Sequence, residues 1–154
     1  MRIGIILYSY SGNSLSVGER LKTALLIKGH EVSIERVKAL DEDPQSTKPI
    51  ILTEIPNISR YDQIILGAPV KKFSLNPIMK EYINKLPDLH DKTFSCFVTE
   101  HFPKAWMGGN HAIKQMKRAI HNKNGVITKT GVVNWSNKMR EEQISEIIDR
   151  FSSC

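Results

Sequence analysis

The sequence predicts an α/β protein in which a five-stranded parallel sheet is covered by helices on both faces. Short apolar runs alternate with segments of helical periodicity along the whole chain. The apolar runs are continuous rather than interrupted by polar residues, which indicates strands that are buried on both sides. Strands that are joined through helices pair in parallel, so this order of elements favours a doubly wound sheet.

The first part of the chain supports two strands and one helix. A continuous apolar run predicts a strand over 3–8. The helix expected over 14–28 ends before Gly29, and glycine favours the position after a helix. Residues 32–37 predict the second strand. The segment 38–60 contains three prolines, so it allows at most a short helix.

The second part of the chain alternates more regularly. Pro77 favours the first position of a helix, because its missing N–H would have no partner there. Apolar residues then recur three and four positions apart, which predicts amphipathic helices. The remaining expected elements are a strand over 64–67, a helix over 77–86, a strand over 93–99, a helix over 112–120, a strand over 125–135 and a helix over 144–151.

Composition bounds the class of protein. A chain of 154 residues predicts one domain, 1–154, and no apolar run approaches the roughly 20 residues of a membrane span. We therefore expect no membrane partner. Cys96 lies in a strand pattern and Cys154 is the last residue, so neither suggests a disulfide framework. Cys96 reads as a packed core thiol, and the reducing cytoplasm is the expected location.

Charge is unevenly distributed along the chain. The net charge is +6, and residues 101–140 contain eight lysines and arginines but no aspartate or glutamate. A basic half favours an anionic ligand or an acidic partner, although a solvated basic face would show the same pattern. Nucleic-acid binding would rest on charge alone, and we do not expect it.

The loop after the first strand carries the clearest chemistry. In a parallel sheet, ligands bind beyond the carboxyl ends of the strands. This loop gathers hydroxyls, an amide and a glycine where a helix begins, and free N–H groups at a helix start attract anions. The pattern predicts a phosphate site, while simple capping of the helix by Ser and Asn remains the alternative. The loop residues are Ser9, Tyr10, Ser11, Gly12, Asn13 and Ser14.

Two motifs resemble one known family. Ser9-x-Ser11-Gly12-Asn13-Ser14 resembles the phosphate loop of flavodoxins, and residues 61–70 are similar to their third strand and flavin loop. The resemblance implies a short-chain flavodoxin-like domain with strand order 2-1-3-4-5 and FMN as cofactor. It places the phosphate on residues 9–14 and the flavin ring between the loops 68–74 and 99–109.

The resemblance also implies which residues of the two ring loops touch the flavin. Lysine stands where a Trp often occurs in the first ring loop, so Phe73 is the only aromatic residue there. His101 could supply a proton, because its ordinary pKa lies near neutrality. The ring-loop residues are Ala68, Pro69, Val70, Lys71, Phe73, Thr99, Glu100, His101, Phe102, Trp106 and Gly108.

Several functions are compatible with this site. The leading expectation is an electron-transfer protein that shuttles electrons between redox partners and docks on an acidic face of its partner. The alternative is an NAD(P)H- or quinone-dependent FMN reductase on the same fold, and a third reading is a binding module that has lost flavin. No metal is expected, since the spacing of Glu100, His101 and His111 matches no ligand pattern. The oligomeric state is left open.

Overall fold

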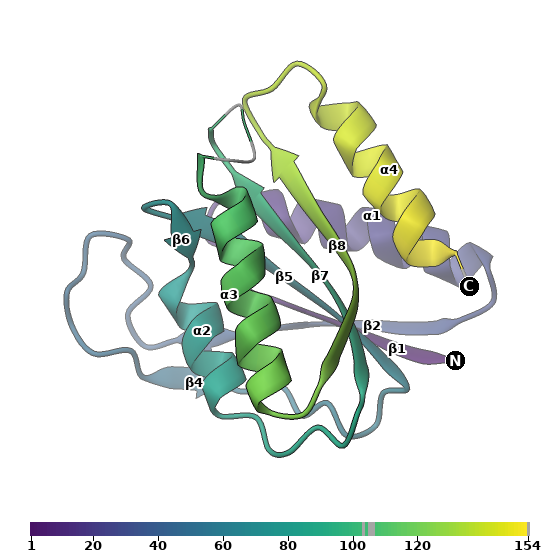
Figure 1. Cartoon of the computed structure of the whole chain (residues 1–154), viewed down its shortest axis with the longest axis horizontal. Helices are drawn as coiled ribbons and strands as arrows, with labels where there is room; N and C mark the ends of the chain where they lie inside the picture. Colours follow the sequence, from purple (N-terminus) through teal and green to yellow (C-terminus); the bar gives the residue numbers. More distant parts are fainter. Residues whose placement is uncertain (103, 105–106, 154) are drawn as a thin grey trace.

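The computed structural model describes residues 1–102, 104 and 107–153, and its centre is a parallel sheet (Figure 1). The strands follow the order β2-β1-β5-β7-β8, and each neighbouring pair is parallel. The predicted order 2-1-3-4-5 is therefore confirmed. The strands are β1 (Arg2–Leu7), β2 (Glu31–Arg36), β5 (Gln63–Lys71), β7 (Thr93–Glu100) and β8 (Val126–Asn134).

Helices cover both faces of the sheet, as predicted. α2 (Pro77–Asn84) and α3 (Gly109–Asn122) lie side by side on one face, with α1 (Asn13–Ile27) behind the sheet in Figure 1. α4 (Arg140–Ser152) shares the second core with α1. No helix in the described part of the chain is both long and apolar enough to cross a membrane.

The helix ends follow the expected local chemistry. Pro77 is the first residue of α2, and the side chain of Asn76 accepts a hydrogen bond of 2.8 Å from the Ile78 N–H. Gly29 follows α1 with a φ of 88°, a conformation that glycine adopts without strain. The His30 N–H then bonds to the Leu25 carbonyl at 3.2 Å, which closes the last turn. These boundaries differ from the predicted ones by a residue or less.

The segment 37–62 contains no helix. It instead forms a small antiparallel sheet from β3 (Lys38–Ala39) and β4 (Leu52–Glu54). Tyr61 closes the segment over the main sheet, directly above Gly4. A Cβ at Gly4 would lie only 2.5 Å from the Tyr61 ring, so the ring uses the space that this glycine leaves. This segment takes the place of a covering helix at the β1–β2 side of the sheet.

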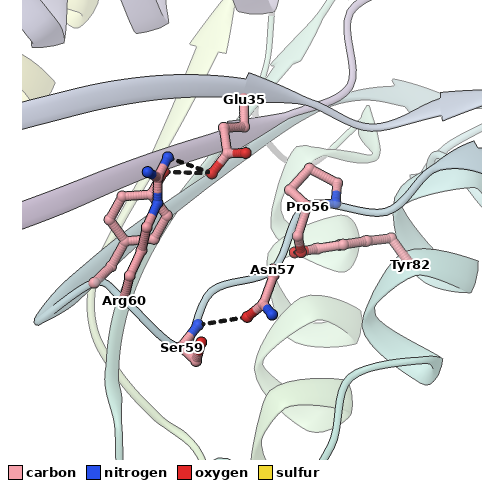
Figure 2. Close-up of polar contacts among 7 residues, drawn as sticks. Glu35, Pro56, Asn57, Ser59, Arg60 and Tyr82 are labelled. Carbon is pink, nitrogen blue, oxygen red and sulfur yellow. Dashed lines mark hydrogen bonds and ion pairs between the residues drawn. The ribbon is translucent and has the colours of Figure 1, made fainter.

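Polar contacts hold this segment in position (Figure 2). The Arg60 guanidinium lies 3.5 Å from the Glu35 carboxylate of β2. The Tyr82 hydroxyl of α2 donates a 2.7 Å hydrogen bond to the Pro56 carbonyl. The segment is thus tied to the sheet on one side and to α2 on the other.

Candidate functional site

The candidate site lies at the carboxyl ends of β1, β5 and β7. A cavity of about 380 Å³ opens there, and its walls include predicted site residues from three loops. A cavity of about 780 Å³ lies at the opposite end of the sheet, beside Arg2, Asp62 and Lys92. We assign the site to the smaller cavity because ligands of parallel sheets bind at the carboxyl ends of the strands. The predicted residues on its wall are Tyr10, Ser11, Pro69, Val70, Lys71 and His101.

The N-cap residue of α1 makes no side-chain cap, so the one side-chain bond that the described residues make to this helix start comes from the preceding loop. The N-cap residue is Gly12, with a φ of 94°, and the first turn of α1 holds no acidic residue. A Cβ at Gly12 would meet nothing within 4 Å, so the space before the helix is open. A helix start presents N–H donors and a partial positive charge, and where the space before it is open these suit a phosphate.

The predicted phosphate loop divides into inward and outward side chains. Ser9 and Ser14 are buried, at 3% and 1% exposure. The Ser9 hydroxyl accepts a 3.2 Å hydrogen bond from the Leu15 N–H, and the Ser14 hydroxyl lies 2.9 Å from that of Thr99. These side chains fix the loop. Ser11 is exposed and Asn13 is half-buried, so these two side chains remain accessible to a ligand.

Arg36 supplies the positive charge that the loop itself lacks. It ends β2 beside Leu7, and its Nη2 donates a 2.8 Å hydrogen bond to the Ser9 carbonyl. Its Nε is buried and has no hydrogen-bond partner among the described residues. Sequence analysis missed this residue. The available signal was its position, because parallel neighbours end at the same edge of a sheet.

The two predicted ring loops meet. β5 extends past the sheet edge and turns back into β6 (Ser74–Leu75) through Lys72 and Phe73, whose φ angles are 48° and 64°. Positive φ at both central residues is typical of a tight hairpin turn. The Phe73 ring stacks on Phe102, with centroids 4.8 Å apart and planes within 9°. Trp106, also predicted here, lies outside the described residues.

Three predicted ring-loop residues belong to the framework beneath the site. Ala68 is fully buried, and Thr99 is engaged with Ser14. A Cβ at Gly108 would lie 2.7 Å from the Phe73 Cα, so this glycine permits close contact between the loops.

Glu100 is also turned into the protein, with 3% exposure. Its Oε1 accepts a hydrogen bond from the Asn134 side chain, and its Oε2 is buried without a partner in the described part of the chain. Burial raises the pKa of Glu100, and the hydrogen bonds from Asn134 and the Gly109 N–H oppose that shift. The carboxyl group therefore lies under the start of α3.

The cavity has an acidic wall that the sequence did not predict. Asp41, Glu42 and Asp43 line it, together with Lys48. The Asp41 carboxylate accepts a 3.0 Å hydrogen bond from the Asp43 N–H, and Glu42 accepts one of 3.1 Å from the Ala39 N–H. These carboxylates thus shape their own loop. Burial and the nearby Glu42 also raise the pKa of Tyr8, which lies on the same wall.

Comparison with known proteins gives a consistent picture of the fold. No family model matches the sequence, and no curated protein matches it either. Solved structures do match. Oxidised flavodoxin 2 from Bacillus cereus is 18% identical, with a TM-score of 0.68 and coverage of 99% of this chain and 98% of that one.

Two further structures extend the comparison. A flavoprotein from Lactobacillus acidophilus in complex with FMN is 15% identical, with a TM-score of 0.66 and 99% coverage of both chains. A flavone reductase is 11% identical, with a TM-score of 0.73 over 99% of this chain and 61% of the reductase. With the strand order above, these similarities show that this chain has the flavodoxin fold.

Proposed function

We propose that this protein binds FMN and carries electrons between redox partners. The observation that carries the proposal is the open space at Gly12 before the start of α1, beside two ring loops that meet through aromatic side chains. FMN combines a phosphate with a flat aromatic ring, so it needs both features. The similar structures support the same cofactor. They include a flavodoxin and a flavoprotein that is in complex with FMN.

The residues present suit the phosphate. Ser11 and Asn13 offer accessible side chains, and the first turn of α1 offers backbone N–H groups. Arg36 adds a positive charge behind the loop through its contact with the Ser9 carbonyl. Hydrogen bonds to an ionised group are roughly twice as strong as neutral ones, so these donors favour the anion.

The residues present also suit the ring. Phe73 and Phe102 provide flat apolar surface, and Pro69 and Val70 line the adjoining cavity. When bound, FMN supplies the electron chemistry. The chain binds the ring, orients it and limits the access of water to it.

A visible absorption spectrum tests the proposal. The purified protein is mixed with FMN, desalted and compared with the same protein treated with riboflavin, which lacks the phosphate. We expect flavin bands to persist after desalting with FMN and to be much weaker with riboflavin. Loss of both flavins would overturn the proposal, and equal retention would overturn the role of the phosphate loop.

The second candidate function is an FMN reductase that uses NAD(P)H or a quinone. Two observations favour it: the cavity of about 380 Å³ beside the ring loops, and the similarity to a flavone reductase. Steady-state oxidation of NADH and NADPH by the FMN-loaded protein, with and without a quinone, separates the two functions. Multiple turnovers would favour the reductase, and their absence would favour the electron carrier.

A further inference from the structure

We infer that the exposed face of α3 is the docking surface for an acidic redox protein. The surface consists of His111, Lys114, Lys117, Arg118 and His121, and we call it the α3 stripe. All five side chains are exposed, and they recur three and four positions apart, so they share one face of the helix. This inference rests on the proposed function and specifies where its partner binds.

The α3 stripe is unpaired. The structure shows no ion pair for any of its five members within the described residues, and α3 carries no acidic side chain. On the opposite side of the helix, Ala112, Ile113, Met116 and Ile120 are buried in the core. The stripe is therefore a concentrated positive surface whose charge the protein itself does not neutralise.

α4 provides a contrast within the same molecule. Its exposed face carries Glu141, Glu142, Glu146 and Asp149. Two of these acids are already paired: Glu141 with Arg20 at 2.7 Å, and Glu146 with Arg150 at 3.4 Å. α4 shares its face of the sheet with α1, which carries Arg20 and Lys22, so that face is close to neutral while the opposite face, with α3, is basic. Such a charge asymmetry orients an approaching charged partner.

The α3 stripe begins at the candidate site. Gly108 precedes α3 and lies against the Phe73 backbone, and the side chain of Gln115 in α3 accepts a 2.7 Å hydrogen bond from the Leu75 N–H. The hairpin that carries Lys72 and Phe73 thus packs along the first turns of the helix. Phe73 is 53% exposed and gives the surface an apolar contact at that end. A partner on the stripe would lie next to the ring loops.

The test uses one acceptor protein in two charge states. Native cytochrome c is basic, and succinylated cytochrome c carries the same haem on an acidic surface. The FMN-loaded protein is reduced with a stoichiometric amount of dithionite and mixed with each form. One fully reduced flavin gives up two electrons, one to each of two ferric haems, which become ferrous while the flavin returns to its oxidised form and releases its protons.

We expect faster electron transfer to the succinylated form, and a marked loss of this preference with salt. Between about 10 mM and 100 mM salt the Debye length falls from about 30 to about 10 Å, which screens the docking charges. In the double variant Lys114→Glu and Arg118→Glu, we expect the rate at low salt to fall by about tenfold or more. The milder Lys114→Gln and Arg118→Gln pair should give an intermediate loss.

A matched control separates local from overall charge. Lys22→Glu in α1 and Lys28→Glu at its C-cap lower the net charge by the same four units as the α3 variant. We expect this control to change the low-salt rate by about twofold or less. Equal losses in the two double variants would overturn the assignment to α3. Thermal melting confirms that each variant is folded.

Binding without flavin distinguishes this inference from the proposed function. The chain free of FMN is titrated with succinylated cytochrome c and monitored by NMR, and we expect shifts at the α3 stripe that salt removes. If FMN is not retained but these shifts occur, the proposed function is wrong and the assignment of the docking surface to α3 is supported. Tighter binding to duplex DNA at the same residues would overturn the choice of a protein partner, as would self-association through α3 and α4 in sedimentation.

Discussion

α1 and α3 begin at the same edge of the sheet and in the same manner, but only one of them offers its first turn to a ligand. Each follows an N-cap glycine with positive φ, Gly12 and Gly108, which has no side chain that could cap the helix. At Gly12 a Cβ would meet nothing within 4 Å, whereas at Gly108 it would lie 2.7 Å from the Phe73 backbone. Glu100 also fills the space under α3 and accepts a hydrogen bond from the Gly109 N–H. The chain's own carboxyl group thus occupies the position that is left open at α1.

This difference shows that glycine serves two purposes at a helix start. At α1 it keeps the space clear for an anion, and at α3 it lets another segment of the chain pack closely. Both helix starts carry the same favourable dipole. The neighbouring residues, rather than the helix end itself, therefore decide which one can bind phosphate.

The largest expected effect is a difference in the free energy of unfolding between alanine variants of the two glycines. Gly108→Ala forces a Cβ into the Phe73 backbone and strains a φ of 128°, so we expect a loss of about 3 kcal/mol in the free energy of unfolding. Gly12→Ala meets only open space and adds mainly the strain of its positive φ, about 1 kcal/mol. Urea denaturation measures both. Similar losses would contradict the difference in packing.

A second pair of variants compares the helix starts by charge. Asn13→Asp places a carboxylate in the first turn of α1 at nearly constant shape. We expect it to raise helix stability by about 0.3–1 kcal/mol, because acids favour a helix start. The same charge should weaken FMN binding by roughly tenfold or more through repulsion of the phosphate.

The matched control is Asn110→Asp, in the first turn of α3. It should give a similar gain in stability and leave FMN affinity unchanged. Flavin fluorescence titrations measure the affinities, with riboflavin as a ligand that neither variant should affect. A loss of FMN affinity in both variants would show that the two helix starts do not differ as described.

Much of the framework could be predicted because the responsible chemistry is local. The apolar run of β1, Pro77 at the start of α2 and Gly29 after α1 each act through their own backbone or their nearest neighbours. The burial of Cys96, which raises its pKa to about 12, also follows from its position inside a strand. The strand order itself came from the resemblance to flavodoxins and not from these residues.

The candidate site was predicted less completely because its residues act through distant partners. Arg36 matters through the β1–β2 register, which places it behind Ser9. Glu100 was expected among the ring-loop residues that touch the flavin, yet α3 and Asn134 bury it. The direction of Ser14 became clear only from the contact with Thr99 across the sheet edge. None of these contacts can be predicted from the residues that flank each partner in the sequence.

A variant of Arg36 is expected to give a smaller effect, and it tests the assignment of the phosphate site to the start of α1. Arg36→Met keeps most of the apolar stem but removes the charge and the hydrogen bond to the Ser9 carbonyl. We expect FMN affinity to fall by about tenfold, since the phosphate loses the attraction of a nearby positive charge. Riboflavin affinity should stay the same. An equal loss for both flavins would mean that Arg36 supports the loop structure rather than the phosphate.

The smallest effect concerns the carboxyl group under α3. Burial raises the pKa of Glu100 in the folded protein above that of an unfolded glutamate, about 4.3. As the pH rises past the unfolded pKa, the unfolded chain releases this proton first, so the wild type loses stability until the pH exceeds the folded pKa. Glu100→Gln cannot ionise and should escape this loss, so its stability relative to the wild type should rise with pH.

Exposed Glu19→Gln is the control, and urea titrations from pH 4 to pH 8 measure the difference. A relative stability that falls with pH would mean that the hydrogen bonds from Gly109 and Asn134 outweigh burial, in which case α3 holds its carboxylate as α1 would hold a phosphate.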